Sequence, residues 1–312
     1  MASQNLYPLF QRGFTKQMIL EYKFWDPKWR DIFHVDTADS RIVDMQNWST
    51  YGILPQFRVP GGNVQQAAIA PSFPKRYIMR SWGLGDSFAS EDIEDDLYAV
   101  IHKVLPGKAG AMARAFQDLL ENETSQFFIV NGYATGTNVP GMFDGLSLFN
   151  VAHPISSTQP YITAANRPAT DVDLSIASLQ AAETNLRTQK PESNIGYIEN
   201  RPRAIVINPS LRYVARQVVD GFWEAFSGNR TENALQEVEI IDWAWFQKSG
   251  STGTNNAWFE VADEHYLDFF MRNAYRTETA YDINTSSQIV TAHCRFDLGA
   301  SNYRGTYGST GL

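Results

Sequence analysis

The 312-residue chain contains little cysteine, little histidine and no long apolar run. Its single cysteine, Cys294, excludes a disulfide bond within the chain. No apolar segment is long enough to cross a bilayer, and Met1–Leu20 lacks the unbroken apolar core of a signal peptide. We therefore expect a protein that is made and used inside a cell, with no membrane partner.

Motifs for catalysis and metal binding are also missing. The sequence has no G-x-S-x-G elbow, no Walker-type glycine loop and no zinc-ligand spacing. Gly83–Gly85 matches only a fragment of a dinucleotide-binding fingerprint. The five histidines are scattered along the chain: His34, His102, His153, His265 and His293. We predict no catalytic residue, no metal ion and no cofactor.

Four features could still suggest chemistry, and each has a simpler interpretation. We expect His153, beside Pro154, to make a structural hydrogen bond, and we expect His265 to lie in a solvated turn after two acidic residues. Cys294 is predicted to be buried and unreactive. The carboxylates of Glu91–Asp96 lack the alternating ligands and the glycine of a calcium loop, and the electrostatics of a helix start explain them.

Negative charge and aromatic side chains narrow the functional class further. The formal net charge of −8 argues against tight nucleic-acid binding across the whole surface. Aromatic residues make up 13% of the chain, including 8 Trp and 19 Phe. Such residues are enriched at the centres of protein interfaces, and they also fill large cores. Composition therefore leaves two interpretations open, an extensive contact surface and a large aromatic core.

The segment Gly107–Val130 predicts a helix about 36 Å long. Its apolar stripe consists of Met112, Phe116, Leu119, Leu120 and Phe127, and its opposite face carries Arg114, Asp118, Glu121 and Ser125. Asn131–Gly132 predicts the end of this helix. A shorter helix is expected before it, because Ser90 and the following carboxylates form a helix-start signal. Pro106–Gly107 would separate the two helices.

Residues 34–89 show little helical periodicity and predict a long two-stranded excursion. Its tip is expected within Thr50–Ser72, and Tyr77–Trp82 reads as the returning strand. An isolated hairpin is marginal in water, so this one must lie on another surface. An ordinary pair of strands in a closed sheet is the alternative. The preceding segment, Met1–Phe33, is basic and aromatic, and it either joins its own domain or lies on a neighbouring molecule.

The remainder alternates helices with strands, which indicates a compact mixed α/β domain. Helices are expected at Asp171–Lys190, with Thr170 as the cap, and from Leu211 onward. Strands are expected at Ala204–Ile207, Val238–Phe246, Trp258–Val261 and Tyr266–Met271, with a hairpin turn at Gly250–Asn256. The alternation over Val290–Leu298 predicts a final strand that has Cys294 on its buried face and His293 on its wet face.

An ordered set of motifs then resembles a known family. The set consists of Ile93–Leu97, the alanine-rich helix, Asp144–Gly145 with Leu148–Phe149, and Ala152–Pro154. In this order they resemble the major head subunits of Mu-like tailed phages, which belong to the phage capsid proteins of the HK97-type fold. The resemblance covers roughly Phe33 to Leu312. It implies an α+β fold with a long spine helix, an extended β-hairpin loop, a mixed α/β axial domain and an N-terminal arm.

The same resemblance implies a division of the chain. Residues 1–33 would form the arm and 34–90 the extended loop. Residues 91–150, completed by 287–312, would form the peripheral domain, and 151–286 the axial domain. The arm and the loop would reach onto neighbouring subunits. Because one sequence must form both hexamers and pentamers, we expect hinges, with Pro106–Gly107 and Asn131–Pro140 as candidates.

The predicted function is structural and not enzymatic. We expect a major capsid subunit that self-assembles through hexamers and pentamers into an icosahedral phage head. Its expected location is the virion, after assembly in the cytoplasm of a bacterial host. Expected partners are further copies of the chain, a scaffold, a portal, possible decoration proteins and DNA contacted non-specifically. A tail-tube or other ring-forming virion protein is one alternative, and a carbohydrate-active hydrolase with two carboxylates is the other.

Overall fold

A computed structural model of the chain describes residues 25–48, 71–89, 100–135, 138–157, 159–221 and 238–312, with isolated positions in 16–20 and 54–69. The side chains of 100–106 and 159 are outside the description. Within these described residues, the α-helices are α3 (Val100–Gln126), α4 (Ile176–Thr188) and α5 (Arg212–Val219), and short helical turns lie at Lys28–Asp31, Phe127–Asn131 and Pro209–Leu211. The strands are β1 (His34–Thr37), β2 (Ile42–Trp48), β3 (Pro71–Ile78), β4 (Arg80–Ala89), β5 (His153–Ser156), β6 (Gln159–Ala164), β7 (Pro202–Ile207), β8 (Glu239–Asp242), β9 (Trp258–Ala262), β10 (Leu267–Asp282), β11 (Ser287–Ala300) and β12 (Thr306–Ser309).

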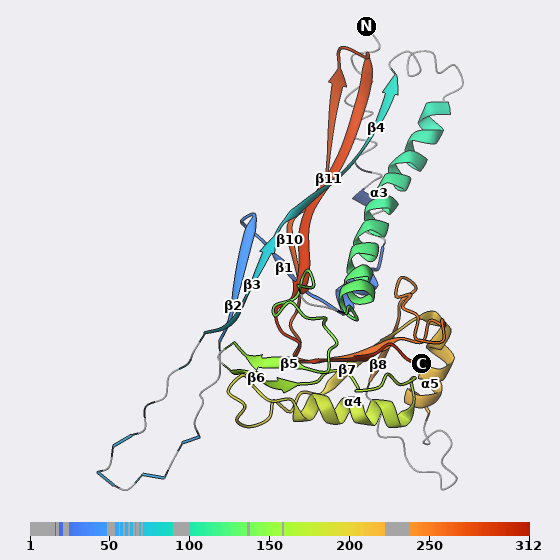
Figure 1. Cartoon of the computed structure of the whole chain (residues 1–312). Coiled ribbons are helices and arrows are strands. Elements are labelled where there is room, and N and C mark those ends of the chain that lie inside the picture. The colour runs from blue at the N-terminus through green and yellow to red at the C-terminus, as the bar shows by residue number, and fades with distance from the viewer. Residues whose placement is uncertain are drawn as a thin grey trace.

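Three parts are visible in Figure 1. The long strands β4, β10 and β11 run beside α3 in an elongated upper part. Helices α4 and α5 lie with a second group of strands in a broader lower part, and the β2–β3 pair projects to one side.

Helix α3 contains 27 residues and is therefore about 40 Å long. The predicted apolar stripe is confirmed, since Met112, Phe116, Leu120 and Phe127 are buried in the main core. The α-helical pattern ends at Gln126 and passes into one π-helical turn, Phe127–Asn131, next to Gly132. The predicted end at Asn131–Gly132 is thus confirmed.

One prediction about this helix is wrong. Pro106–Gly107 does not separate two helices, because α3 runs through both residues. A proline in a helix costs one backbone hydrogen bond, and the packing of buried residues such as Ala109 and Ala113 further along outweighs that local signal. Glu121 and Ser125 are buried, although Arg114 and Asp118 on the same predicted face are exposed. The later turns of α3 are covered on two sides, which a single apolar stripe does not indicate.

The first sheet has the order β1-β10-β11-β4 and packs against α3. Strand β1 pairs in parallel with β10, and the other pairs are antiparallel. Lys108 of α3 reaches Asp86 of β4 at 3.1 Å, which identifies the face of β4 toward the helix. Strand β11 alternates as predicted, because Cys294 and Phe296 are buried and His293 is half-buried. Strand β10 is 16 residues long and extends well beyond the predicted Tyr266–Met271.

The second sheet has the order β12-β9-β7-β8, and only β7 and β8 pair in parallel. Helices α4 and α5 bury their apolar sides against it in a separate cluster. Helix α4 begins at Ile176 and not at Asp171, because Ser175, and not Thr170, caps it through a capping box with Ser178. The predicted strand at Val238–Phe246 is limited to the four residues of β8.

Strand pairing crosses the domain boundary that was expected at residue 287. Strand β10 precedes residue 287 in sequence, yet it pairs with β11 in the first sheet. Strand β12 comes from the end of the chain, yet it pairs with β9 in the second sheet. The turn at Gly250–Asn256 forms, but it is not a hairpin, because β7 lies between β8 and β9.

Candidate functional site

The β2–β3 ribbon is the most exposed sheet in the described chain. Its register runs from Ile42 opposite Ile78 to Trp48 opposite Pro71, so the predicted two-stranded antiparallel excursion forms. Its returning strand is Pro71–Ile78 and not the predicted Tyr77–Trp82, whose later residues belong to β4 and pair with β11. Pro71 and Ser72, the last two residues of the range in which the tip was expected, already belong to β3. One face of the ribbon packs against Phe270 of β10. The other face and both outer edges have no strand partner among the described residues.

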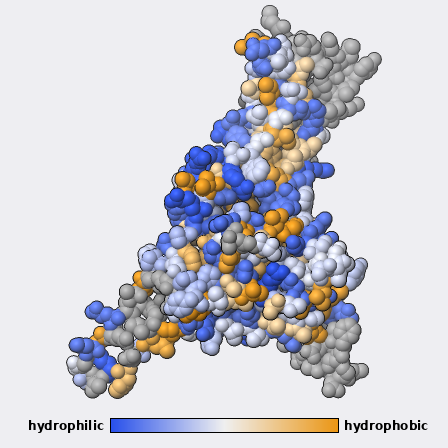
Figure 2. All heavy atoms as spheres, in the orientation of Figure 1, coloured by the Kyte–Doolittle hydropathy of each residue, from blue (hydrophilic) through white to orange (hydrophobic). Residues whose placement is uncertain are grey.

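Exposed apolar side chains concentrate on this excursion. The large exposed ones within residues 42–78 are Ile42, Trp48, Leu54, Phe57, Val64, Ile69 and Ile78. Phe57 is 95% exposed and Trp48 is 63% exposed. Figure 2 shows apolar spheres along this projection at the lower left. Exposed apolar groups gathered in one place mark an interaction site.

The root of the ribbon is anchored by polar contacts. Lys75 Nζ donates to the carbonyl of Met142 at 3.2 Å, and the Tyr77 hydroxyl donates to Asp268 Oδ2 at 2.8 Å. The amide of Ile78 donates to Asp297 Oδ2 at 2.9 Å. Burial lowers the pKa of Lys75 and raises those of Asp268 and Asp297. These contacts hold the ribbon in a fixed direction relative to the first sheet.

Glu121 of α3 joins three separate segments. Its Oε2 accepts a hydrogen bond from Trp243 Nε1 at 2.6 Å, just beyond β8. Its Oε1 accepts from the amide of Lys28 at 3.2 Å. Burial raises the pKa of this carboxyl.

Trp29 and Phe33, which follow Lys28, are buried in the main core, so the end of the proposed arm belongs to its own subunit. The arm residues before Trp25 lie outside the described residues apart from isolated positions.

His153 has the structural role that we expected. It is fully buried, its Nδ1 lies 2.7 Å from Asp144 Oδ2, and its Nε2 lies 3.1 Å from the carbonyl of Leu148. Its ring stacks on Tyr303 with centroids 4.5 Å apart. Every polar atom of the imidazole is occupied, and the ring holds the loop after α3 against β5.

His265 does not lie in a solvated turn. Its side chain is 7% exposed and stacks on His34 with ring centroids 4.0 Å apart. Burial lowers the pKa of His265 to about 3, and the charges of His34 and Arg203 act in the same direction. The acidic neighbours Asp263 and Glu264 in the sequence suggested exposure, but the partners that enclose the ring come from distant segments.

The remaining candidate residues carry no assembled reaction centre in the described chain. Cys294 is buried, and burial raises the pKa of its thiol to about 12. Gly83–Gly85 lies inside β4 and forms no glycine loop. The acidic run Glu91–Asp96 lies outside the described residues. The described ranges contain no group of three metal-ligating side chains and no helix that could span a membrane.

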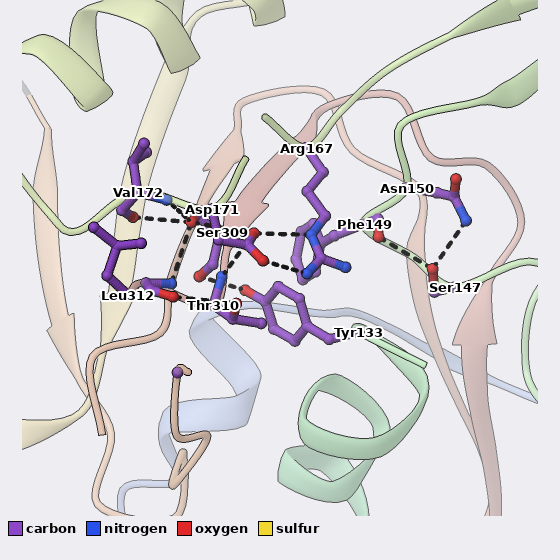
Figure 3. A network of polar contacts seen from close by, with 12 residues as sticks. Tyr133, Ser147, Phe149, Asn150, Arg167, Asp171, Val172, Ser309, Thr310 and Leu312 are labelled. Atoms are coloured by element: carbon purple, nitrogen blue, oxygen red, sulfur yellow. Dashed lines mark hydrogen bonds and ion pairs between the residues drawn. The ribbon is translucent and has the colours of Figure 1, made fainter. Parts of the chain in front are cut away.

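A polar network fixes the end of the chain into the second sheet (Figure 3). Arg167 Nη2 and Asp171 Oδ2 form an ion pair at 2.6 Å. The Tyr133 hydroxyl donates to the carbonyls of Trp258 at 3.0 Å and Ser309 at 3.3 Å. The Ser309 hydroxyl donates to the carbonyl of Val172 at 2.9 Å. The loop after α3, the segment before α4 and β12 are thereby joined.

A comparison with models of protein families identifies the family of this chain. A family model described as phage capsid protein matches residues 80–309, about three quarters of the chain. The chain therefore belongs to the phage capsid protein family. It is a structural major capsid protein with the HK97-type fold, and a component of the virion. A search of curated protein sequences gives no match.

Solved structures share the fold at low sequence identity. The capsid of the cyanophage P-SCSP1u has a TM-score of 0.54 and 11% identity, covering 90% of this chain and 86% of that chain. The capsid of a native GTA particle has a TM-score of 0.54 and 11% identity, with 91% and 90% covered. The holo-SrpI encapsulin complex of Synechococcus elongatus PCC 7942 has a TM-score of 0.52 and 7% identity, with 93% and 89% covered.

Proposed function

We propose that this capsid protein assembles with copies of itself, as hexamers and pentamers, into a closed icosahedral head around phage DNA. The observation that carries the proposal is the set of exposed apolar side chains within residues 42–78, on β2, on β3 and at the described positions between them. A subunit that acted alone would leave Phe57 and Trp48 in water, whereas a neighbouring subunit can cover them. The excursion would then tie each subunit to the next. Repeating one modest contact many times around a shell gives strength through multivalency.

The division of labour follows the two sheets. We assign the first sheet and α3 to a peripheral domain, and the second sheet with α4 and α5 to an axial domain that clusters around capsomer axes. In this proposal β10 belongs to the peripheral domain and β12 to the axial domain, and the pairing of β10 with β11 and of β12 with β9 supports that assignment. The loop at Asn131–Pro140 remains the hinge candidate, while the break expected at Pro106–Gly107 is absent.

The other partners follow from the same role. Assembly would take place in the host cytoplasm with a scaffold and a portal, and decoration proteins could bind the finished shell. The net charge of −8 suits a wall that encloses DNA and contacts it non-specifically without gripping it.

A pair of surface variants tests the proposal. Phe57→Ser removes an exposed apolar group from the excursion, and Tyr161→Ser removes a similarly exposed ring from β6 as a matched control. We expect both proteins to fold with the wild-type melting temperature. Only Phe57→Ser should reduce shell yield in electron microscopy and light scattering. Equal yields from both variants would contradict the proposed role of the excursion.

Replacing residues 49–70 with a short Gly-Ser linker is the stronger version of this test. The cut spares β2 and β3, which reach Trp48 and Pro71. The product should be a folded, soluble protein that no longer closes shells. Global unfolding of this variant would show that the excursion belongs to the core.

A further inference from the structure

Glu260 is a buried carboxylate in the middle of the second sheet. It lies on β9 and its side chain is only 1% exposed. Trp258 and Ala262 share its face of the strand, since side chains alternate along β9. Both belong to the apolar cluster that Leu179 and Ala182 of α4 complete. The carboxylate is therefore enclosed between the sheet and α4.

Among the described residues, the surroundings of Glu260 supply no compensating charge. Its neighbours across the sheet are Tyr307 on β12 and Ile205 on β7. Helix α4 contributes Glu183, a second carboxylate, whose partner at 2.6 Å is Arg187. Glu260 Oε2 has no hydrogen-bond partner within the described part of the chain. A charge left alone in such a layer is costly, so a proton is the simplest way to remove it.

The pKa of Glu260 agrees with this geometry. Burial raises the pKa of Glu260 to about 8, and the negative charge of Glu183 adds a smaller effect in the same direction. The folded chain at neutral pH therefore holds a proton on a side chain that is ionised in water.

We propose that Glu260 acts as a proton-controlled latch for α4. The helix packs on β9 while the carboxylate of Glu260 is neutral, and the contact between α4 and β9 weakens when that carboxylate is ionised. The ionised carboxylate can regain hydration only if α4 separates from the sheet and admits water. This property belongs to the single subunit and does not depend on shell assembly. It would make the axial part of the protein sensitive to a pH range that cells and buffers reach.

Linkage sets the direction and the slope of the effect. Opening exposes Glu260 to water, where its pKa returns to the ordinary value of 4.5. The proton therefore stabilises the closed helix fully below pH 4.5, and this contribution is lost as pH rises to about 8. Between those limits the opening equilibrium of α4 should increase about tenfold per pH unit, and above them it should level off.

Hydrogen exchange of the full-length chain at pH 6, 7 and 8 tests the latch, after correction for intrinsic exchange. In the wild type, α4 amides should open about tenfold more with each pH unit, while α3 amides serve as an internal reference. Glu260→Gln should abolish this dependence. Glu239→Gln, at an exposed position on β8, should keep it. A pH-independent wild type, or the same slope in Glu260→Gln, would overturn the proposal.

An infrared titration of the wild type keeps the proposal testable if Glu260→Gln does not fold. The absorption of a protonated carboxylic acid should be present at pH 7 and disappear with a midpoint near pH 8. If no such band titrates in that range, Glu260 is not protonated in the folded chain and the latch is excluded.

Discussion

The indole of Trp243 donates a hydrogen bond to Glu121 Oε2 at 2.6 Å, across 122 positions of sequence. The contact links the spine helix to the chain that follows β8, so it spans the proposed peripheral and axial domains. The second oxygen of Glu121 holds the amide of Lys28. One carboxylate therefore helps to fix how three segments of the capsid subunit sit together.

Removing this carboxylate should destabilise the subunit. Glu121→Ala leaves the buried indole N–H without an acceptor, which costs about 1–3 kcal/mol of unfolding free energy. Glu121→Gln keeps an acceptor and should cost less. Asp118→Ala, at an exposed position on the same helix, is the matched control and should stay within about 0.5 kcal/mol of wild type. Urea unfolding of the three variants measures these differences, and equal losses for Glu121→Ala and Asp118→Ala would refute the joint.

The stacked pair of His34 and His265 should make stability depend on acid. The pKa of His265 is lowered to about 3 from its usual 6.5, so the unfolded chain binds the proton more tightly. The contribution of His265 is therefore present above pH 6.5 and is lost as pH falls toward 3. His265→Phe keeps a ring in the stack and should flatten the dependence of the unfolding free energy between pH 7 and 5. An unchanged slope in this variant would show that other groups cause the acid sensitivity.

The cap of α4 offers a test of a helix boundary. Ser175 accepts a hydrogen bond from the amide of Ser178, so Ser175→Ala should cost about 1 kcal/mol. Thr170 lies outside the helix, and Thr170→Ala should have almost no effect on the melting temperature. The opposite ranking of the two variants would place the helix start at Asp171.

The thiol of Cys294 should be protected in the folded subunit. Its burial on the α3 face of β11 raises its pKa to about 12, and the thiolate is the reactive form. Labelling with a thiol reagent at pH 8 should be slower by roughly two to three orders of magnitude in the folded chain than in urea. Rapid labelling of the native protein would show that β11 opens readily.

The elements with strong periodicity could be predicted from the sequence. The stripe from Met112 to Phe127 and the alternation around Cys294 each follow from a single packing face, and both are confirmed. The predicted antiparallel ribbon also forms, because turn signals separate its two strands, although its returning strand is Pro71–Ile78 and not Tyr77–Trp82. Each of these predictions depends on residues that are close together in the chain.

The errors arose where distant segments decide the environment. Glu121 lies on the face opposite the apolar stripe of α3, yet Trp243 and Lys28 contact it, and no residue near Glu121 in the sequence indicates either partner. His265 follows two carboxylates but stacks on His34, which β1 brings to β10. Pro106 indicated a helix break that tertiary packing overrides. The buried Glu260 gave no sequence signal at all, because β9 reads as an ordinary short strand.

The central claim is that this capsid protein builds closed shells from copies of itself. Electron microscopy of the purified protein, with light scattering on the same sample, tests it most directly. The account predicts closed shells or rings of capsomers. A monomer that stays monomeric under crowding, with and without candidate scaffold proteins, would contradict it.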